Sequence, residues 1–306
     1  MITHNHAPYI AQAIESVLAQ VTTFDVELVI GEDASLDDTR RIVQDYHRRY
    51  PDRIRLLLPP RSLGARANIQ ATMKACRGKY VALLEGDDFW IDPGKLQAQV
   101  ELLDANPAAF ICGARALVWK EGAATPSVTT PDQDSAELKS FGAREMFEGR
   151  WWFRTCTKMF PRHVLQQVPA KFGSLDWHGT MWLIAATNFG QVCFLDRPVG
   201  VYREHPGGAW SSLPRYDQSA NDIRTLYDLI PVFDGAERAF LRRVMADHMS
   251  ELLKSPEMSK SERIVCACLS AIRTPRELAS WRRLASSIGL ALRRPESPRG
   301  GSGLVG

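Results

Sequence analysis

The chain has 306 residues, of which 45% are hydrophobic and 24% charged, with a formal net charge of +3; this composition is typical of a globular protein, and the length allows one large α/β domain with an appendage. We find neither a signal peptide nor an apolar run of about 18 residues, so the sequence predicts no membrane span, and we expect no nucleic-acid partner. The six cysteines are dispersed without a C-x-x-C pair, which favours reduced thiols in a cytoplasmic protein over a disulfide framework.

Short apolar runs alternate with amphipathic segments through the N-terminal half of the chain. We expect strands at Glu27–Ile30, Ile54–Leu58 and Tyr80–Leu84, and helices at Thr39–Tyr50 and Asn68–Ala75. A further helix at 95–106 and a strand at 110–113 follow. Alternation at this spacing predicts an α/β fold with a mostly parallel sheet and right-handed crossovers.

Two of the predicted strands run directly into carboxylates. The strand at 80–84 is followed by EGDD at positions 85–88, and the strand at 27–30 by a segment that contains Asp33. Because open α/β sheets bind ligands beyond the carboxyl ends of their strands, we expect Asp33 and Asp87 to lie side by side at that edge. Mg²⁺ takes one or two protein carboxylates and completes its shell with water and phosphate oxygens. The pattern therefore predicts a metal–diphosphate site, with a solvated acidic turn as the simpler alternative.

Six blocks in a fixed order resemble bacterial family 2 glycosyltransferases. They are THNHAPYIAQAIESVLAQ, ELVIGEDASLDDT, LGARANIQATMKACRGKYVALLEGDDFW, RTCTKMFPRHVL, LDW at 175–177 and VYREHPGG at 201–208, and together they cover roughly residues 1–212. The resemblance implies the glycosyltransferase A fold, with a nucleotide-binding, Rossmann-like sheet. It also implies transfer of a sugar from a nucleotide diphosphate, with inversion at the anomeric carbon and with Mg²⁺ or Mn²⁺ as cofactor.

The resemblance assigns roles to the acidic residues of these blocks. Asp33 would contact the nucleotide base, and Asp87 would bind the metal. Asp88 would support the ribose, the metal or a hydroxyl of the donor sugar. Glu85 replaces the first acid of the family's DxD-type motif, a departure that leaves its contact with the ribose open. Asp176 stands where the family has its catalytic base, which would remove the proton of the acceptor hydroxyl.

Four further residues are candidates near the donor: Arg66, Asn68 and His205 by resemblance, and Asn5 by its place after the first strand. Arg66 and Asn68 would lie close to the donor, and Asn5 in the first loop could meet the nucleotide. His205 matches a histidine that approaches the metal or the diphosphate. An ordinary turn is the alternative for His205, since Pro-Gly-Gly follows it.

Two candidate sites have simpler structural interpretations. Asp176 could be the N-cap of a helix expected at Trp177–Asn188, a position that Asp favours. His4 and His6 form an H-x-H pair, but such a pair without a third ligand is a poor metal site, and we do not expect metal there.

The first strand is reduced to Met1-Ile2-Thr3, whereas the family opens with a full hydrophobic strand. A missing central strand would leave buried backbone groups of its neighbours unpaired, which is costly. We therefore expect the remainder of this strand to lie upstream of Met1.

The C-terminal part is basic and helical in character. We expect a catalytic domain over residues 1–234, a helical extension over 235–293 and a disordered tail over 294–306. Residues 235–306 contain 13 Lys+Arg and 7 Asp+Glu, a net charge of +6. Their predicted helices could lie on an anionic membrane surface or simply pack on the catalytic domain, and they span Ala236–Leu253, Lys260–Ile272 and Glu277–Leu292.

The residues and the resemblance together lead us to expect an inverting, metal-dependent glycosyltransferase, and the resemblance implies that it acts in bacterial surface polysaccharide or lipopolysaccharide assembly. Its donor would be a nucleotide-diphosphate sugar and its acceptor a saccharide or lipid-linked saccharide. We expect it in the cytoplasm, or at the inner membrane if the extension binds lipid. A sugar nucleotidyltransferase is one alternative, but the first loop lacks the Gly-rich, basic sequence of such enzymes. A non-catalytic nucleotide-sugar-binding module is another, against which the presence of both Asp87 and Asp176 argues.

Overall fold

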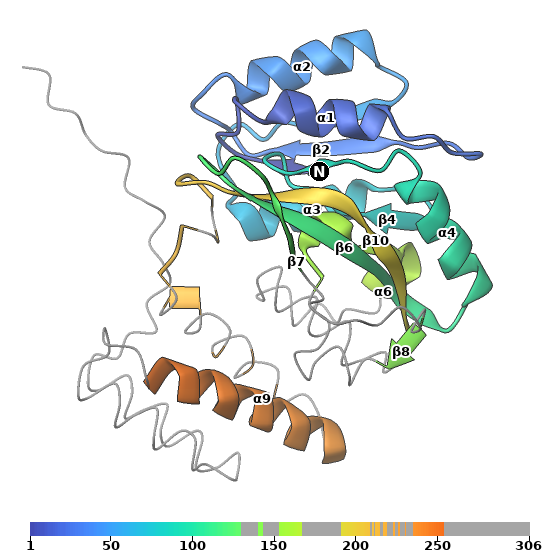
Figure 1. The fold of residues 1–306 in the computed structure, drawn as a ribbon. Coiled ribbons are helices and arrows are strands. Elements are labelled where there is room, and N and C mark those ends of the chain that lie inside the picture. Colours follow the sequence, from blue (N-terminus) through green and yellow to red (C-terminus); the bar gives the residue numbers. More distant parts are fainter. Residues whose placement is uncertain are drawn as a thin grey trace, which may run out of the picture. The chain divides into compact units, whose positions relative to one another are not determined.

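The computed structural model describes residues 1–129, 140–142, 153–166, 191–208 and 235–253, together with isolated positions between 210 and 230. The chain divides into two compact units, Met1–Ser212 and Leu213–Gly306. The first unit contains two sheets, which meet at the N-terminal strand (Figure 1). The expected boundaries at residues 234 and 293 stay predictions.

The first sheet has the parallel arrangement that the sequence predicts. Its order is β1-β2-β3, and both pairs are parallel. The strands span Ile2–Thr3 (β1), Leu28–Glu32 (β2) and Ile54–Leu57 (β3). Every residue of β2 is buried, which fits a central strand covered on both faces.

Three helices cover this sheet. They span Ile10–Leu18 (α1), Thr39–Arg49 (α2) and Ala65–Ala75 (α3). Figure 1 shows α1 and α2 together on one side of β2, whereas α3 lies on the other and packs on β1 and β2. Helix α3 begins three residues before the predicted start. It directly follows Gly64, whose positive φ of 81° is not helical. As a result Arg66 lies in its first turn.

The second sheet is mixed, with the order β4-β9-β6-β10-β5. β6 and β10 pair in parallel, and the neighbouring pairs are antiparallel. The strands span Tyr80–Ala82 (β4), Phe89–Trp90 (β5), Ala109–Lys120 (β6), Met159–Pro161 (β9) and Gln191–Glu204 (β10). The strand predicted at 110–113 is therefore the start of a much longer one, because β6 continues along β10.

Short elements complete the first unit. Helix α4 packs on β6 and β10, β7 forms a hairpin with β6, and β8 pairs with β10. The 3₁₀ turn η2 and helix α6 flank β9. Their bounds are Lys95–Ala105 (α4), Ser127–Thr129 (β7), Ser140–Gly142 (β8), Thr155–Thr157 (η2) and Arg162–Gln166 (α6).

Strand β1 connects the two sheets although it has only two residues. The Ile2 amide donates to the Leu84 carbonyl (3.3 Å), and the Ile2 carbonyl accepts from the Gly86 amide (2.8 Å). On its other side, the Met1 carbonyl accepts from the Gly31 amide (2.9 Å). The expectation that the strand ends of Asp33 and Asp87 are direct neighbours was wrong, because β1 lies between them.

A cavity of about 580 Å³ lies beside Met1, between the N-terminal parts of β2 and β4. Its wall is largely apolar and includes Leu28, Tyr80, Ala82, Leu84 and Met159. The Met1 ammonium donates to the Val29 carbonyl at the end of this cavity (2.7 Å), and burial lowers the pKa of the ammonium. The cavity thus lies between β2 and β4, in line with the N-terminal end of β1.

The described part of the second unit centres on α9 (Gly235–Leu253), which matches the helix expected at 236–253. The side chains of Leu241, Met245 and Met249 on this helix are buried. The helices predicted at 260–272 and 277–292 lie outside the described residues. None of the described helices is long and apolar enough to cross a bilayer.

Candidate active site

The EGDD segment turns where Ile2 of β1 forms a parallel bridge with Glu85, a few residues after β4 ends. The Asp88 amide donates to the Glu85 carbonyl (3.2 Å), which closes a tight turn around Gly86 and Asp87. A Cβ atom on Gly86 would lie 2.5 Å from Oγ1 of Thr3, so only glycine fits against β1. Backbone pairing with β1 therefore fixes where the three acids stand.

Burial and mutual repulsion raise the pKa of two of these acids, Asp88 and Glu85. Asp88 is only 1% exposed, and burial followed by the charges of Asp87 and Glu85 raises its pKa well above the ordinary value. Burial and then Asp87 raise the pKa of Glu85 to about 7, against the opposing effect of Lys158. Such crowding of carboxylates disfavours their charged forms unless a cation is present.

Three carboxylate oxygens of this segment have no hydrogen-bond donor among the described residues: Oε2 of Glu85, Oδ1 of Asp87 and Oδ2 of Asp88. Buried anionic oxygens without partners are rare, and hard oxygen ligands are what Mg²⁺ and Mn²⁺ prefer. The residues thus fit a divalent cation that takes further oxygen ligands from water and diphosphate. Within the described residues, however, no three His, Cys, Asp or Glu side chains converge closely enough to hold an ion by themselves.

Two histidines approach the same oxygen of Asp87. Nε2 of His205, at the end of β10, lies 3.1 Å from Oδ2, and Nε2 of His6 lies 3.6 Å from it. The Tyr9 ring packs on His205 with 4.7 Å between centroids. The structure therefore brings His205 to Asp87, and its approach to a metal or diphosphate stays a prediction. His6 was missed, because an H-x-H pair in a loop carries no signal that one ring will meet an acid about 80 residues away.

Arg203 is a second residue that sequence reasoning missed. Its backbone amide donates to Oδ1 of Asp88 (2.9 Å), and its guanidinium donates to the Asp87 carbonyl and to the side chain of Gln12. The guanidinium carbon lies 4.5 Å from the centroid of the Phe89 ring. Arg203 thus holds the acid segment from the side of β10 and adds positive charge beside it.

Asp33 lies at the end of β2, and its carboxylate holds the loop that leads into α3. Oδ1 accepts from the Leu63 amide (2.7 Å), and Oδ2 accepts from the Ser62 hydroxyl (2.8 Å) and the Gly64 amide (3.0 Å). A carboxylate offers about four acceptor positions, so these bonds use most of its capacity. Asp33 therefore anchors the loop, and one acceptor position of its carboxylate remains.

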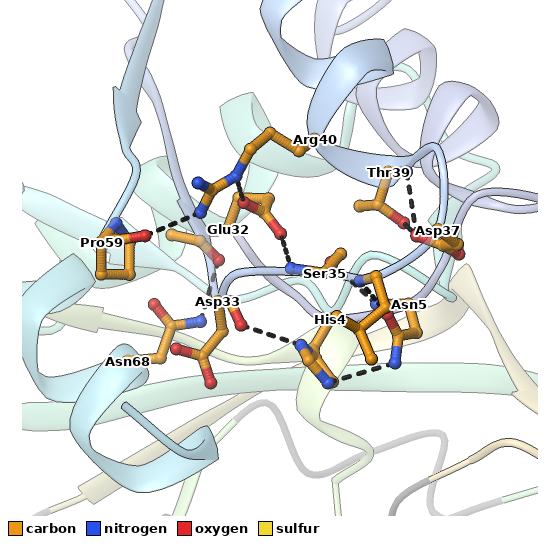
Figure 2. Close-up of polar contacts among 12 residues, drawn as sticks. His4, Asn5, Glu32, Asp33, Ser35, Asp37, Thr39, Arg40, Pro59 and Asn68 are labelled. Carbon is orange, nitrogen blue, oxygen red and sulfur yellow. Dashed lines mark hydrogen bonds and ion pairs between the residues drawn. The ribbon is translucent and has the colours of Figure 1, made fainter. Parts of the chain in front are cut away.

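The first loop is tied to the loop after β2 (Figure 2). Oδ1 of Asn5 accepts from the Leu36 amide (2.8 Å), and the Asn5 amide donates to the Ser35 hydroxyl (2.9 Å). Asn5 has a φ of 56°, which Asn tolerates better than most residues. His4 joins the two loops again through Nδ1 and the Asp33 carbonyl (2.9 Å).

An ion pair between the buried Glu32 and the partly exposed Arg40 supports the same loop. Nε of Arg40 donates to the fully buried Glu32, whose other oxygen accepts from the Ser35 amide (2.6 Å). Nη2 of Arg40 also donates to the Pro59 carbonyl (2.8 Å), as Figure 2 shows. The three loops that carry Asn5, Asp33 and the α3 entrance are therefore connected into one framework.

The remaining candidates fall in different places. Asn68 is buried, and its side-chain amide donates to the Gly31 carbonyl (2.9 Å), so it joins α3 to β2. Arg66 is exposed on the first turn of α3. Asp176 and the helix expected at 177–188 lie outside the described residues.

The fold is similar to that of solved glycosyltransferase structures. The structure of TarS residues 1–349 from S. aureus in complex with UDP-GlcNAc superimposes with a TM-score of 0.64 at 17% identity, over 92% of this chain and 82% of that one. The mannosyltransferase PcManGT from Pyrobaculum calidifontis, in complex with GDP-Man and Mn²⁺, gives a TM-score of 0.59 at 18% identity, over 96% of this chain and 80% of that one. These likenesses support the glycosyltransferase A fold.

Sequence comparison gives relatives in several bacteria, among them Mycobacterium tuberculosis and Rhizobium meliloti. Rv1520, an uncharacterized protein of Mycobacterium tuberculosis, is 34% identical over 212 residues, which are 69% of this chain and 59% of the relative. The chain thus spans less than two thirds of that relative. The succinoglycan biosynthesis protein ExoO of Rhizobium meliloti is 26% identical over 264 residues, 83% of this chain and 70% of ExoO. Residues 1–169 match the profile of glycosyl transferase family 2, so the chain belongs to that family.

Proposed function

We propose that this protein is an inverting, metal-dependent glycosyltransferase that uses a nucleotide-diphosphate sugar as donor. The observation that carries the proposal is the group of carboxylate oxygens of Glu85, Asp87 and Asp88 that lack donors among the described residues, next to His205. A site of this kind suits a cation together with a diphosphate, because both oxygen ligands and a compensating charge are needed there. The complexes of TarS with UDP-GlcNAc and of PcManGT with GDP-Man and Mn²⁺ support the same choice of ligands.

Each candidate residue has a separate task in the proposed reaction. A divalent cation, when bound, would neutralise the negative charge that develops on the departing diphosphate. Asp87 would hold this cation, and the carboxylates of Glu85 and Asp88 would lie beside it. Asp33 would accept a hydrogen bond from the base with its remaining acceptor position, and Asn5 would order the loop beside the nucleotide.

The acceptor side of the proposed reaction depends on Asp176. A carboxylate opposite the leaving diphosphate can remove the proton of the acceptor hydroxyl as that oxygen attacks the anomeric carbon. Attack from the face opposite the diphosphate inverts the configuration. Arg66 would contribute positive charge near the donor, whereas Asn68 would act by fixing α3 to β2.

We place the reaction in the assembly of a cell-surface polysaccharide or lipopolysaccharide, with a saccharide or lipid-linked saccharide as acceptor. The name of ExoO, and that of TuaG from Bacillus subtilis, a putative teichuronic acid biosynthesis glycosyltransferase 31% identical over 120 residues, support this setting. A cytoplasmic enzyme would reach a lipid-linked acceptor at the inner leaflet of the membrane. The basic residues of 235–293 would then provide peripheral contact with anionic lipid.

Turnover of a panel of UDP- and GDP-sugars with Mn²⁺ tests this proposal. We expect release of nucleoside diphosphate that EDTA abolishes, and an Asp176→Asn variant that is roughly 10²–10⁴-fold slower in transfer, as for loss of a general base. Proton NMR of the first product should show the inverted anomer. Retention of configuration, or an Asp176→Asn variant with full transfer activity, would contradict the proposed mechanism.

A further inference from the structure

Oδ2 of Asp87 is enclosed by two imidazoles that come from opposite ends of the catalytic unit. His205 Nε2 lies at hydrogen-bond distance from it (3.1 Å), whereas His6 Nε2 approaches it to 3.6 Å, just beyond hydrogen-bond distance. The two rings meet edge to face, with 6.3 Å between centroids. A carboxylate only accepts hydrogen bonds, so Nε2 of His205 donates to it, and an N–H at Nε2 of His6 would point its positive end at the same oxygen.

His6 is held rigidly in this position by its own backbone. Its amide donates to the hydroxyl of Thr39 (2.8 Å), at the start of α2. Its carbonyl accepts from the amides of Tyr9 and Ile10, both at 2.9 Å, where α1 begins. The His6 side chain is 14% exposed. The ring is therefore placed against Asp87 by the starts of two helices and not by a mobile loop.

The other oxygen of Asp87 is free for a different partner. Oδ1 is buried and has no hydrogen-bond donor among the described residues. The hydrogen bond from His205 and the approach of His6 are both on Oδ2, and no donor among the described residues meets Oδ1, so one rotation of the carboxylate about the Cβ–Cγ bond is favoured. Oδ1 is thereby the oxygen left to face a cation.

We propose that His6 is a positioning residue for the metal acid: together with His205 it holds Oδ2 of Asp87, so that Oδ1 is presented to the cation. This inference rests on the proposed function, in which Asp87 binds a divalent metal. It gives His6 a role through Asp87 and without direct contact to the metal or the nucleotide. Partners of this kind typically contribute 10–100-fold to metal affinity.

The first test is Mn²⁺ affinity in the presence of UDP, measured by electron paramagnetic resonance of free Mn²⁺ on the full chain. We expect His6→Ala to weaken Mn²⁺ binding by roughly 10-fold, the lower end of that range because its contact is the longer one. His6→Gln, which retains an N–H donor, should recover part of the loss. His47→Ala is the matched control, because His47 lies on α2 and its ring contacts the Ile54 carbonyl.

Two results of this titration would overturn the inference. One is a His6→Ala variant that is folded and whose Mn²⁺ affinity differs from that of His47→Ala by less than two-fold. The other is an equal loss of UDP affinity in EDTA, since His6 would then contact the nucleotide directly. A His6→Gln variant that is thermally more stable than His6→Ala but binds Mn²⁺ no more tightly would also count against the inference.

A second readout does not depend on the proposed function. In the metal-free protein, ring ¹⁵N spectra should show protonated Nε2 and bare Nδ1 for both His6 and His205, and Asp87→Ala should shift both sets of signals. Unchanged His6 signals in Asp87→Ala would overturn the inference. If the wild-type protein binds neither Mn²⁺ nor nucleotide while the ring signals respond as expected, the proposed function fails and the contact between His6 and Asp87 stands.

Discussion

The backbone amide of Arg203 donates to Oδ1 of Asp88 at 2.9 Å, across 115 positions of the sequence. This bond ties the acid segment after β4 to the end of β10, the longest strand of the second sheet. It also gives a buried carboxylate a donor, which partly offsets the burial and the repulsion from Asp87 that raise its pKa.

Substitutions at Asp88 should separate the contribution of the hydrogen bond from Arg203 to stability from that of the charge on the Asp88 carboxylate. Asp88→Ala leaves the Arg203 amide without its acceptor, and we expect a loss of about 1–3 kcal/mol in the free energy of unfolding. Asp88→Asn retains an oxygen acceptor and removes the repulsion from Asp87, so its stability should equal or exceed that of the wild type. Urea denaturation at pH 7.5 without metal measures both. An Asp88→Asn variant as unstable as Asp88→Ala would show that charge, and not the hydrogen bond, holds the segment.

A lysine is enclosed in the core of the first unit. Lys95 has no exposed surface, its Nζ donates to Oε1 of Gln99 (2.6 Å), and it lies 4.2 Å from the centroid of the Trp90 ring. No carboxylate pairs with it among the described residues. Burial lowers the pKa of Lys95 to about 7.

Lys95 should make stability depend on alkaline pH. Between pH 7 and the ordinary lysine pKa, the unfolded chain carries a proton that the folded chain lacks, so the free energy of unfolding rises with pH. From pH 7 to pH 9 this amounts to about 2 kcal/mol for one group. Lys158, whose pKa burial lowers to about 8, adds in the same direction.

Replacement by methionine isolates the contribution of Lys95. We expect Lys95→Met to reduce the rise between pH 7 and pH 9 by about 2 kcal/mol, whereas Lys74→Met on the exposed face of α3 should leave it unchanged. Chemical denaturation at several pH values measures the slope. A slope in Lys95→Met equal to that of the wild type would mean that Lys95 is charged in the folded protein.

The close contact between β2 and α3 predicts a strict requirement at Gly31. A Cβ atom there would lie 2.0 Å from Oγ1 of Thr72 and 2.4 Å from Oδ1 of Asn68. We expect Gly31→Ala to cost about 1–3 kcal/mol, as for other overpacked sites, and Thr72→Ala in the same chain to recover part of it. Gly94→Ala, whose nearest contact would be 3.4 Å, is the control. Equal stability of the two alanine variants would show that α3 can move away from β2 at little cost.

The cavity beside Met1 predicts that the protein gains stability from an extended apolar segment joined to the Met1 nitrogen. Five residues such as valine and isoleucine would pass between 28–30 of β2 and 80–82 of β4, and would replace a buried ammonium by an amide. Burial of even one such side chain contributes about 1.5–3 kcal/mol, or several degrees in melting temperature. A Gly/Ser extension of equal length is the control. Equal melting temperatures for both extensions would show that the cavity does not accept a strand.

Much of the first sheet could be predicted because its signals are local. The strands and helices that were predicted between residues 27 and 106 start and end within three residues of the predicted positions, since apolar periodicity and turn residues mark them, whereas the short strand β5 in this range was not predicted. Strand β10 was not predicted. It contains Asp196 and Pro198, and its register with β6 shifts there, a pattern that argues against a strand unless the partner is known.

The site was predicted in part for the same reason. Acids at strand ends are visible in the sequence, and Asp87 and His205 do meet. His6 and Arg203 reach the site only through pairing of distant segments, which no local pattern reports. The bonds from Asp33 to residues 62–64 were equally hidden, because they depend on how the loop before α3 folds back.

The most direct test of a metal-dependent nucleotide site is a calorimetric titration with UDP and with GDP, each with Mn²⁺ and with EDTA. We predict that the wild type binds at least one of them only with Mn²⁺, because Asp87 offers its unpartnered Oδ1 to a cation, and that Asp87→Asn loses this binding while remaining folded. Asp104→Asn, at an exposed position on α4, should bind like the wild type. Binding that is the same in EDTA, or a folded wild type that binds neither nucleotide, would contradict the account.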